Sequence, residues 1–135
     1  MSLMIWGPMF EVGVQQIDTQ HRKLFDLANE LADAVREGKG ALPLGKILNE
    51  LTTYTQIHFA AEEQLMSRHG YPATAEHKAC HQELTKRVAE FKRALQAGDV
   101  AIVDDALQFF TAWLSKHIME IDKAFAKALK QKDIR

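Results

Sequence analysis

Apolar side chains recur at three- and four-residue steps in four stretches of the chain, and this periodicity most constrains the fold. Glycine and proline interrupt the pattern at Gly38 and Gly40, at Gly70 and Pro72, and at Gly98. Helices often end at such residues, because glycine tolerates left-handed backbone. The sequence therefore predicts four helices, over about residues 18–37, 43–69, 73–97 and 100–130. The short connections favour antiparallel neighbours and an all-α, up-down-up-down four-helix bundle.

Length and composition fit one domain spanning residues 1–135, because 47% of the 135 residues are apolar and suffice for one core. Residues 1–17 are predicted to form an N-terminal arm, residues 18–130 the bundle and residues 131–135 a tail. In the arm, Val12 and Val14 alternate around Gly13, and Pro8 disfavours an early helix. We expect the arm to lie extended across the bundle.

The charge pattern excludes several classes of partner. The 17 basic and 18 acidic residues nearly cancel, so neither nucleic acid nor an anionic membrane is an expected partner. No apolar run approaches the roughly 20 residues that span a bilayer, so membrane insertion is not expected. The apolar start lacks the positive region of a signal peptide, since the first basic residue is Arg22. The single cysteine, Cys80, excludes an intrachain disulfide and fits a reducing compartment, so we expect a cytoplasmic protein.

The inward, apolar face of the predicted helices carries five of the six histidines, and two carboxylates lie close to them in sequence. They are His21, His58 with Glu62, His77 with His81, and His117 with Asp122. Burying ionisable groups costs several kcal/mol each unless they are paired, so this inward set calls for a compensating charge. Imidazole is the commonest metal ligand and a carboxylate can bridge two cations. The set therefore predicts a pair of bound metals.

The depth of these residues along the bundle supports the same interpretation. They fall near the start of the first and third helices, near the end of the second and in the later half of the fourth. In an up-down-up-down bundle those four places lie at the same end. Taken alone, His21 or His117 is more often a hydrogen-bonded core histidine than a ligand, and the pair of His77 and His81 is an even choice. Only their convergence favours metal, and His69, beside Gly70, does not fit the set.

The fourth helix poses a spacing problem. At about 100° per residue, His117 and Asp122 lie roughly 140° apart on a regular α-helix, so Glu120 is the better-placed rival ligand. A single-turn π-helix brings residues five apart into line, and such turns favour functional sites. We therefore predict a local distortion between His117 and Asp122, with Glu120 turned towards solvent.

The order and spacing of the seven residues resemble those of the hemerythrins. The opening motifs resemble those of the single-domain bacterial branch, the bacteriohemerythrins: Trp6, Val12-Gly13-Val14 and Ile17-Asp18-x-Gln20-His21. The resemblance covers nearly the whole chain. It implies a non-haem di-iron site. One iron would be bound by His77, His81 and His117, and the other by His21 and His58. Glu62 and Asp122 would bridge both, with a solvent-derived oxo or hydroxo group, and the two-histidine iron would keep a position open for dioxygen.

Apolar residues near the predicted ligands are candidates for an oxygen pocket that excludes water. They are Leu24, Phe59, Trp113, Leu114 and Ile118. Plain core packing explains any single one of them equally well. One departure is Phe125, one turn beyond Asp122, where some hemerythrins carry tyrosine, so a hydroxyl role there does not transfer.

Three classes of function follow from this set, in order of preference. The first is reversible dioxygen binding without catalysis, for storage, delivery to an oxygen-consuming enzyme, or sensing. The second is a di-iron enzyme acting on peroxide, nitric oxide or dioxygen. Ferritin-like oxidases carry a Glu-x-x-His on each of two helices, and that paired pattern is absent here. The third is an interaction module that responds to iron or oxygen and requires a separate signalling partner.

Overall fold

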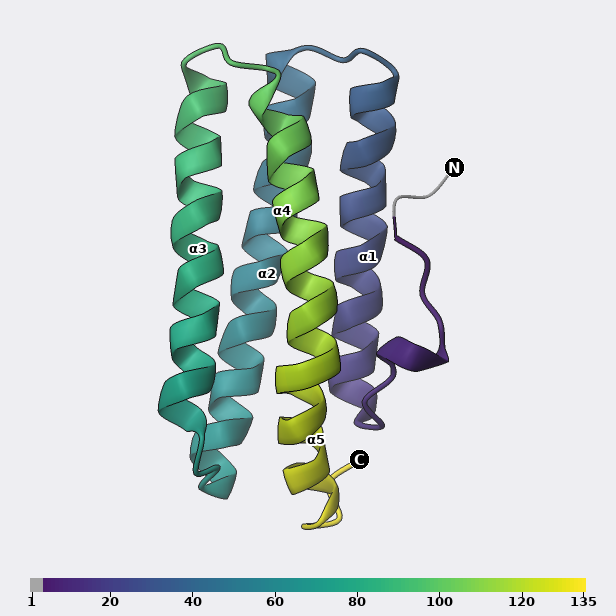
Figure 1. Ribbon diagram of the computed structural model, residues 1–135, viewed down its shortest axis with the longest axis vertical. Helices are drawn as coiled ribbons and strands as arrows, with labels where there is room; N and C mark the ends of the chain where they lie inside the picture. Colours follow the sequence, from purple (N-terminus) through teal and green to yellow (C-terminus); the bar gives the residue numbers. More distant parts are fainter. Residues whose placement is uncertain (1–3) are drawn as a thin grey trace.

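The computed structural model describes residues 4–135 and shows a bundle of antiparallel helices (Figure 1). The first three are α1 (Gln15–Arg36), α2 (Ala41–His69) and α3 (Thr74–Gln96). A fourth rod comprises α4 (Ile102–Lys116), a π-helical turn η2 (His117–Asp122) and α5 (Lys123–Lys130). Each helix contacts its neighbours in chain order, and α4 closes the bundle against α1. The predicted four-helix bundle is confirmed.

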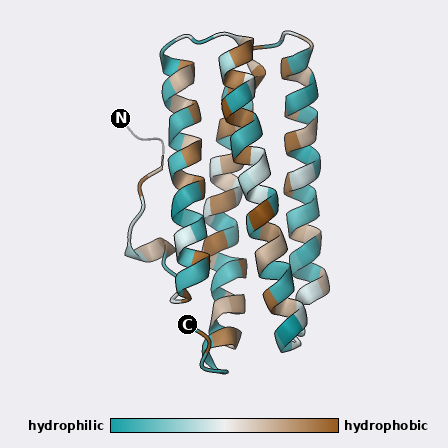
Figure 2. Cartoon of the chain, turned by 180° about the vertical axis from the view of Figure 1, so that it is seen from behind, coloured by the Kyte–Doolittle hydropathy of each residue, from teal (hydrophilic) through white to brown (hydrophobic). Residues whose placement is uncertain are grey.

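Amphipathic helix faces build the core. Figure 2 shows hydrophilic and hydrophobic residues alternating around each helix. Ile17, Leu24 and Leu84 are fully buried, and Phe25, Leu114 and Leu129 nearly so. Each such side chain contributes roughly 1.5–3 kcal/mol relative to an exposed one. Packing of these apolar faces therefore holds the helices in place.

The α2–α3 connection shows why glycine ends these helices. Gly70 caps α2 with φ 63° and ψ 43°, a left-handed conformation that other residues adopt at a cost. His69, the last residue of α2, is half-buried, and its carbonyl accepts a 2.5 Å hydrogen bond from Lys132 Nζ. This contact involves the backbone of His69, and its side chain lies outside the group of inward histidines.

The N-terminal arm differs from its predicted form. Helix α1 begins at Gln15, about three residues earlier than expected, because the Asp18 carboxylate accepts hydrogen bonds from the Val12 and Gly13 N–H groups at 2.8 and 3.1 Å. The arm also contains a 3-10 turn, η1 (Pro8–Phe10), and is therefore not extended throughout. Of the predicted arm, residues 1–3 lie outside the described part.

Contacts with α1 hold the arm along that helix (Figure 1). The Asn29 side chain exchanges two 2.8 Å hydrogen bonds with the backbone of Met4. Trp6 and Phe10 pack against Phe25 at ring-centroid distances of 5.1 and 4.9 Å. The arm therefore covers the outer face of α1. Within residues 4–135 no helix is both long enough and apolar enough to cross a membrane.

Candidate metal centre

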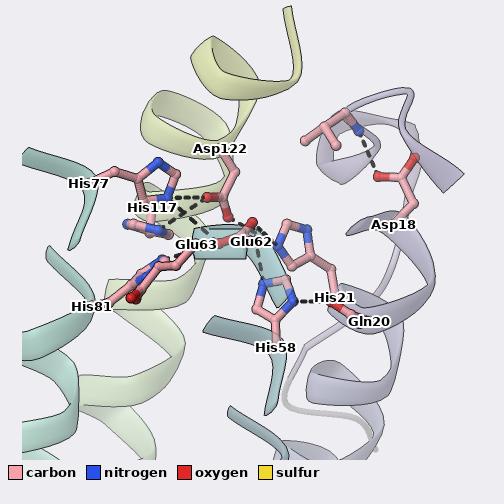
Figure 3. A network of polar contacts seen from close by, with 11 residues as sticks. Asp18, Gln20, His21, His58, Glu62, Glu63, His77, His81, His117 and Asp122 are labelled. Carbon is pink, nitrogen blue, oxygen red and sulfur yellow. Dashed lines mark hydrogen bonds and ion pairs between the residues drawn. The ribbon is translucent and has the colours of Figure 1, made fainter. Parts of the chain in front are cut away.

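Seven ionisable side chains converge inside one end of the bundle (Figure 3). All are buried, with at most 5% of any residue exposed. They come from α1 (His21), α2 (His58 and Glu62), α3 (His77 and His81) and η2 (His117 and Asp122). These are the seven residues that the sequence predicted as metal ligands. The prediction that these side chains lie together at one end of the bundle is confirmed.

The side chains form two groups that share both carboxylates. In the three-histidine group, His77, His81 and His117 lie with Glu62 and Asp122, and one potential ligand atom from each lies within 4.8 Å of the others. In the two-histidine group, His21 and His58 lie with the same carboxylates under the same limit. The first group therefore offers five donors and the second offers four.

Each carboxylate turns one oxygen towards each group. Glu62 Oε1 lies 3.1 Å from His81 Nε2, and Glu62 Oε2 lies 3.5 Å from His58 Nε2. Asp122 Oδ1 lies 3.1 Å from His117 Nε2, and Asp122 Oδ2 lies 3.0 Å from His21 Nε2. A carboxylate with its two oxygens facing different histidine groups has the orientation needed to bridge two cations.

Buried polar atoms without partners test whether a metal pair fits. Eleven buried side-chain nitrogens and oxygens of the described residues lack a hydrogen-bond partner, and all except Trp6 Nε1 belong to this cluster. Leaving such atoms unsatisfied is costly. Two ligands about 2.1 Å from one ion and at right angles lie about 3.0 Å apart, which matches the 3.0–3.1 Å contacts of Asp122. The residues therefore fit a metal pair.

Electrostatics keep the carboxylates ionised. Burial and the neighbouring Asp122 would raise the pKa of Glu62, but the charge of His58 and the close approach of the His77 and His81 rings lower it to about 2. The pKa of Asp122 is likewise held well below its usual value, because the close approach of the His117, His21 and His77 rings outweighs burial. Both side chains thus present the anionic form that binds cations.

The histidines respond to the same surroundings in opposite ways. Burial lowers the pKa of His58 to about 4, and the nearby Glu62 only partly offsets this. At His77 burial also lowers the pKa, but the nearby carboxylates of Asp122 and Glu62 raise it to about 9. Without a cation, protonated imidazole supplies part of the positive charge that the two carboxylates require.

The fourth rod contains the predicted distortion. Residues His117–Asp122 form a π-helical turn between α4 and α5. His117 Nε2 and Asp122 Oδ1 consequently lie 3.1 Å apart, whereas Glu120 is exposed to solvent. The prediction of a π-helical turn is confirmed, and the rival assignment of Glu120 is excluded because its side chain points away from the cluster.

Two polar residues to which the sequence assigned no role at the site, Gln20 and Glu63, contact the outer nitrogens of two histidines. Gln20 Oε1 lies 2.6 Å from His58 Nδ1, and Glu63 Oε2 lies 2.9 Å from His81 Nδ1. Each is adjacent in sequence to an inward-facing residue, His21 or Glu62. A polar residue beside a predicted ligand was the available signal, but its partner on the next helix could not be identified from spacing.

Apolar and aromatic residues enclose the cluster. The Phe59 ring stacks on His81 at 3.8 Å between centroids, and Trp113 stacks on His117 at 4.3 Å. Leu24, Leu114 and Ile118 are at most 1% exposed. Phe125 is fully buried and meets the His77 ring edge-on at 5.6 Å. Of the five predicted pocket residues, four are buried and Trp113 is half-buried.

Comparison with known proteins agrees with this geometry. Residues 12–129 match the family model of the hemerythrin HHE cation binding domain. The chain is 38% identical over 130 residues to a bacteriohemerythrin of Stenotrophomonas maltophilia, covering 96% of this chain and 84% of the relative. It is 35% identical to the bacteriohemerythrin of Methylococcus capsulatus, covering 96% and 98% respectively.

Solved structures extend the likeness to three dimensions. A wild-type hemerythrin with 34% sequence identity superposes with a TM-score of 0.89, covering 95% of this chain and 98% of that one. Family model, relatives and superposition agree, and the cluster that this chain builds is one able to bind metal. The chain belongs to the hemerythrin family.

Proposed function

We propose that this hemerythrin holds two iron ions and binds dioxygen reversibly. The observation that carries the proposal is the unequal division of donors around two shared carboxylates, five in one group and four in the other. A site with fewer protein ligands keeps a position for an external molecule. The two-histidine group of His21 and His58 is therefore the proposed side for dioxygen.

The ligand chemistry suits iron in two oxidation states. When bound, the two irons would supply the two electrons that pass to dioxygen and return on its release. His77, His81 and His117 would hold one ion, and His21 and His58 the other. Glu62 and Asp122 would hold both at a fixed separation and offset part of their charge. No side chain of the cluster is consumed in this scheme.

Buried apolar side chains would keep the site dry. Leu24 lies one turn after His21, and Leu114 lies one turn before His117, both on the inward face of their helices. Excluding water and stray protons hinders release of a reduced oxygen species and return of the irons to the oxidised state. We propose the same role for Phe59, Trp113 and Ile118.

The decisive experiment is a cycle of oxygen addition and removal. Purified protein is loaded with ferrous iron under nitrogen, exposed to dioxygen and then purged, with visible spectra recorded at each step. Reversible binding predicts that the reduced and oxygenated spectra alternate over several cycles. Sustained consumption of dioxygen, peroxide or nitric oxide with an added reductant would instead identify a di-iron enzyme.

The proposal includes three physiological roles for the bound dioxygen: storage, delivery to an oxygen-consuming enzyme, and sensing through a signalling partner. It also includes a cytoplasmic location, which the single free thiol supports.

A further inference from the structure

Gln20 and Glu63 contact the outer ring nitrogens of one histidine in each metal group. Gln20 Oε1 lies 2.6 Å from His58 Nδ1, in the two-histidine group. Glu63 Oε2 lies 2.9 Å from His81 Nδ1, in the three-histidine group. We propose that Gln20 and Glu63 are positioning residues that give the two metal sites different preferences for oxidation state, one through a neutral amide and the other through a carboxylate. This inference rests on the proposed di-iron function.

Helix geometry explains how these two residues reach the rings. Successive residues point about 100° apart around a helix axis. When His21 of α1 faces the cluster, the preceding Gln20 faces the neighbouring helix α2, where it meets His58 (Figure 3). When Glu62 of α2 faces the cluster, the following Glu63 faces α3 and meets His81. Each contact therefore links adjacent helices beside a ligand.

The inner contacts fix which nitrogen carries the proton. Nε2 of His58 and of His81 faces Glu62, at 3.5 and 3.1 Å respectively. When Nε2 gives its lone pair to a metal, Nδ1 carries the hydrogen and donates it outward. Both outer partners present an oxygen that accepts this hydrogen. Gln20 and Glu63 therefore hold their rings in the orientation and tautomer that a metal requires.

The two acceptors differ in charge, and that difference reaches the metal. A hydrogen bond to an ionised carboxylate is stronger than one to a neutral amide. The carboxylate draws the Nδ1 proton outward and makes the ring a better electron donor. His81, supported by Glu63, should therefore stabilise the more highly charged ion better than His58, supported by Gln20. The two-histidine group, where dioxygen is proposed to bind, should therefore favour ferrous over ferric iron more than the three-histidine group does.

Exchanging the two acceptor types tests the inference. Glu63→Gln removes the charge and keeps an acceptor, and Gln20→Glu adds a charge at the other group. The side chain of Glu63 is 30% exposed and Gln20 is half-buried, so both variants are expected to fold. Glu83→Gln is the matched control for Glu63→Gln, because Glu83 is exposed and lies two residues from His81 without contacting its ring. Gln56→Glu is the control for Gln20→Glu, because Gln56 is exposed and lies two residues from His58 without contacting its ring.

Two measurements are made on each protein. Affinity for Co²⁺ is obtained by competition with a chelator, and the reduction potential is obtained by titrating iron-loaded protein. Glu63→Gln should bind Co²⁺ about tenfold more weakly and have a higher reduction potential. A tenfold change in ferric over ferrous preference corresponds to about 59 mV for one electron. Gln20→Glu should shift both quantities in the opposite direction, and the controls should match the parent.

The outcomes separate this inference from the proposed function. If the parent binds two metals per chain while the variants shift no more than their controls, the positioning role is overturned and the di-iron function stands. A shift of the same sign in both variants would show general disturbance of the site and would also overturn it. A parent that binds fewer than two metals would overturn both proposals. Circular dichroism of the metal-free proteins verifies that each variant is folded.

Discussion

Truncating Leu114 to alanine should destabilise the fold by an amount set by its burial. The residue lies on α4 and is 1% exposed. Leu→Ala changes at such sites cost about 2.7–5.0 kcal/mol, because the lost apolar contacts leave a cavity. Unfolding entropy of about 2.1 cal/mol/K per residue gives about 0.28 kcal/mol/K for 135 residues. A loss of about 3 kcal/mol should thus lower Tm by about 10 °C, measured by circular dichroism on heating.

The same substitution should shorten the lifetime of the oxygenated protein. Leu114 lies one turn before His117, so the new space adjoins the metal cluster and admits water. Decay of the oxygenated spectrum to the oxidised one, followed well below Tm, should be several-fold faster than in the parent.

Leu107→Ala separates this local effect from lost stability. Leu107 lies two turns earlier on α4, is 4% exposed, and borders an apolar hollow with Leu31 and Phe110. Its Cα is about 10 Å from that of Leu114 along the helix axis. The two variants should lose similar stability, but only Leu114→Ala should decay faster. Equal acceleration in both would refute the assignment of Leu114 to the pocket wall, and so would an unchanged decay rate in Leu114→Ala.

Four further predictions concern the cluster and its surroundings. Asp122→Asn should lower iron content, because it removes the charge of a shared carboxylate. Glu120→Gln should leave iron content and the oxygenated spectrum nearly unchanged, and iron loss in the Glu120 variant alone would contradict the assignment of Asp122 as the metal ligand. His77→Ala should hold fewer than two irons per chain by metal analysis. It should also lose much of the stabilisation that metal binding gives, which is about 2.7 kcal/mol at 100 times Kd and is measured as a rise in Tm. Protons compete for the same Nε2 lone pairs, and the pKa of His77 is about 9 without metal, so the apparent affinity for Co²⁺ should rise as pH rises from about 6 to about 9; competition with a chelator, corrected for the chelator's own protonation, measures this, and an affinity that stays constant over this range would contradict it. Burial raises the pKa of the Cys80 thiol, so its alkylation rate should reach half its maximum at a higher pH than that of an exposed cysteine in a short peptide measured alongside, and equal midpoints would argue against that shift.

Local spacing in the sequence determined most of the helices and the inward residues. Apolar periodicity requires no tertiary information, because every residue on a helix face must satisfy the same rotation of about 100° per step. The same arithmetic exposed the conflict between His117 and Asp122 and by itself favoured Glu120. The π-helical turn that the structure contains was predicted because it aligns residues five apart, and the resemblance to the hemerythrins agreed with that choice. Antiparallel topology then placed all seven residues at one end of the bundle.

Contacts between helices decided the rest. Asp18 advances the start of α1 by bonding to Val12 and Gly13 in the arm, an arrangement that helix periodicity does not encode. The rotation of each carboxylate, with one oxygen towards each histidine group, depends on how closely four separate helices approach one another. Gln20 and Glu63 are likewise identified only by the ring across the interface. Helix periodicity gives the direction in which a side chain points from its own helix. Only the packing of the helices determines which side chain of the neighbouring helix it contacts.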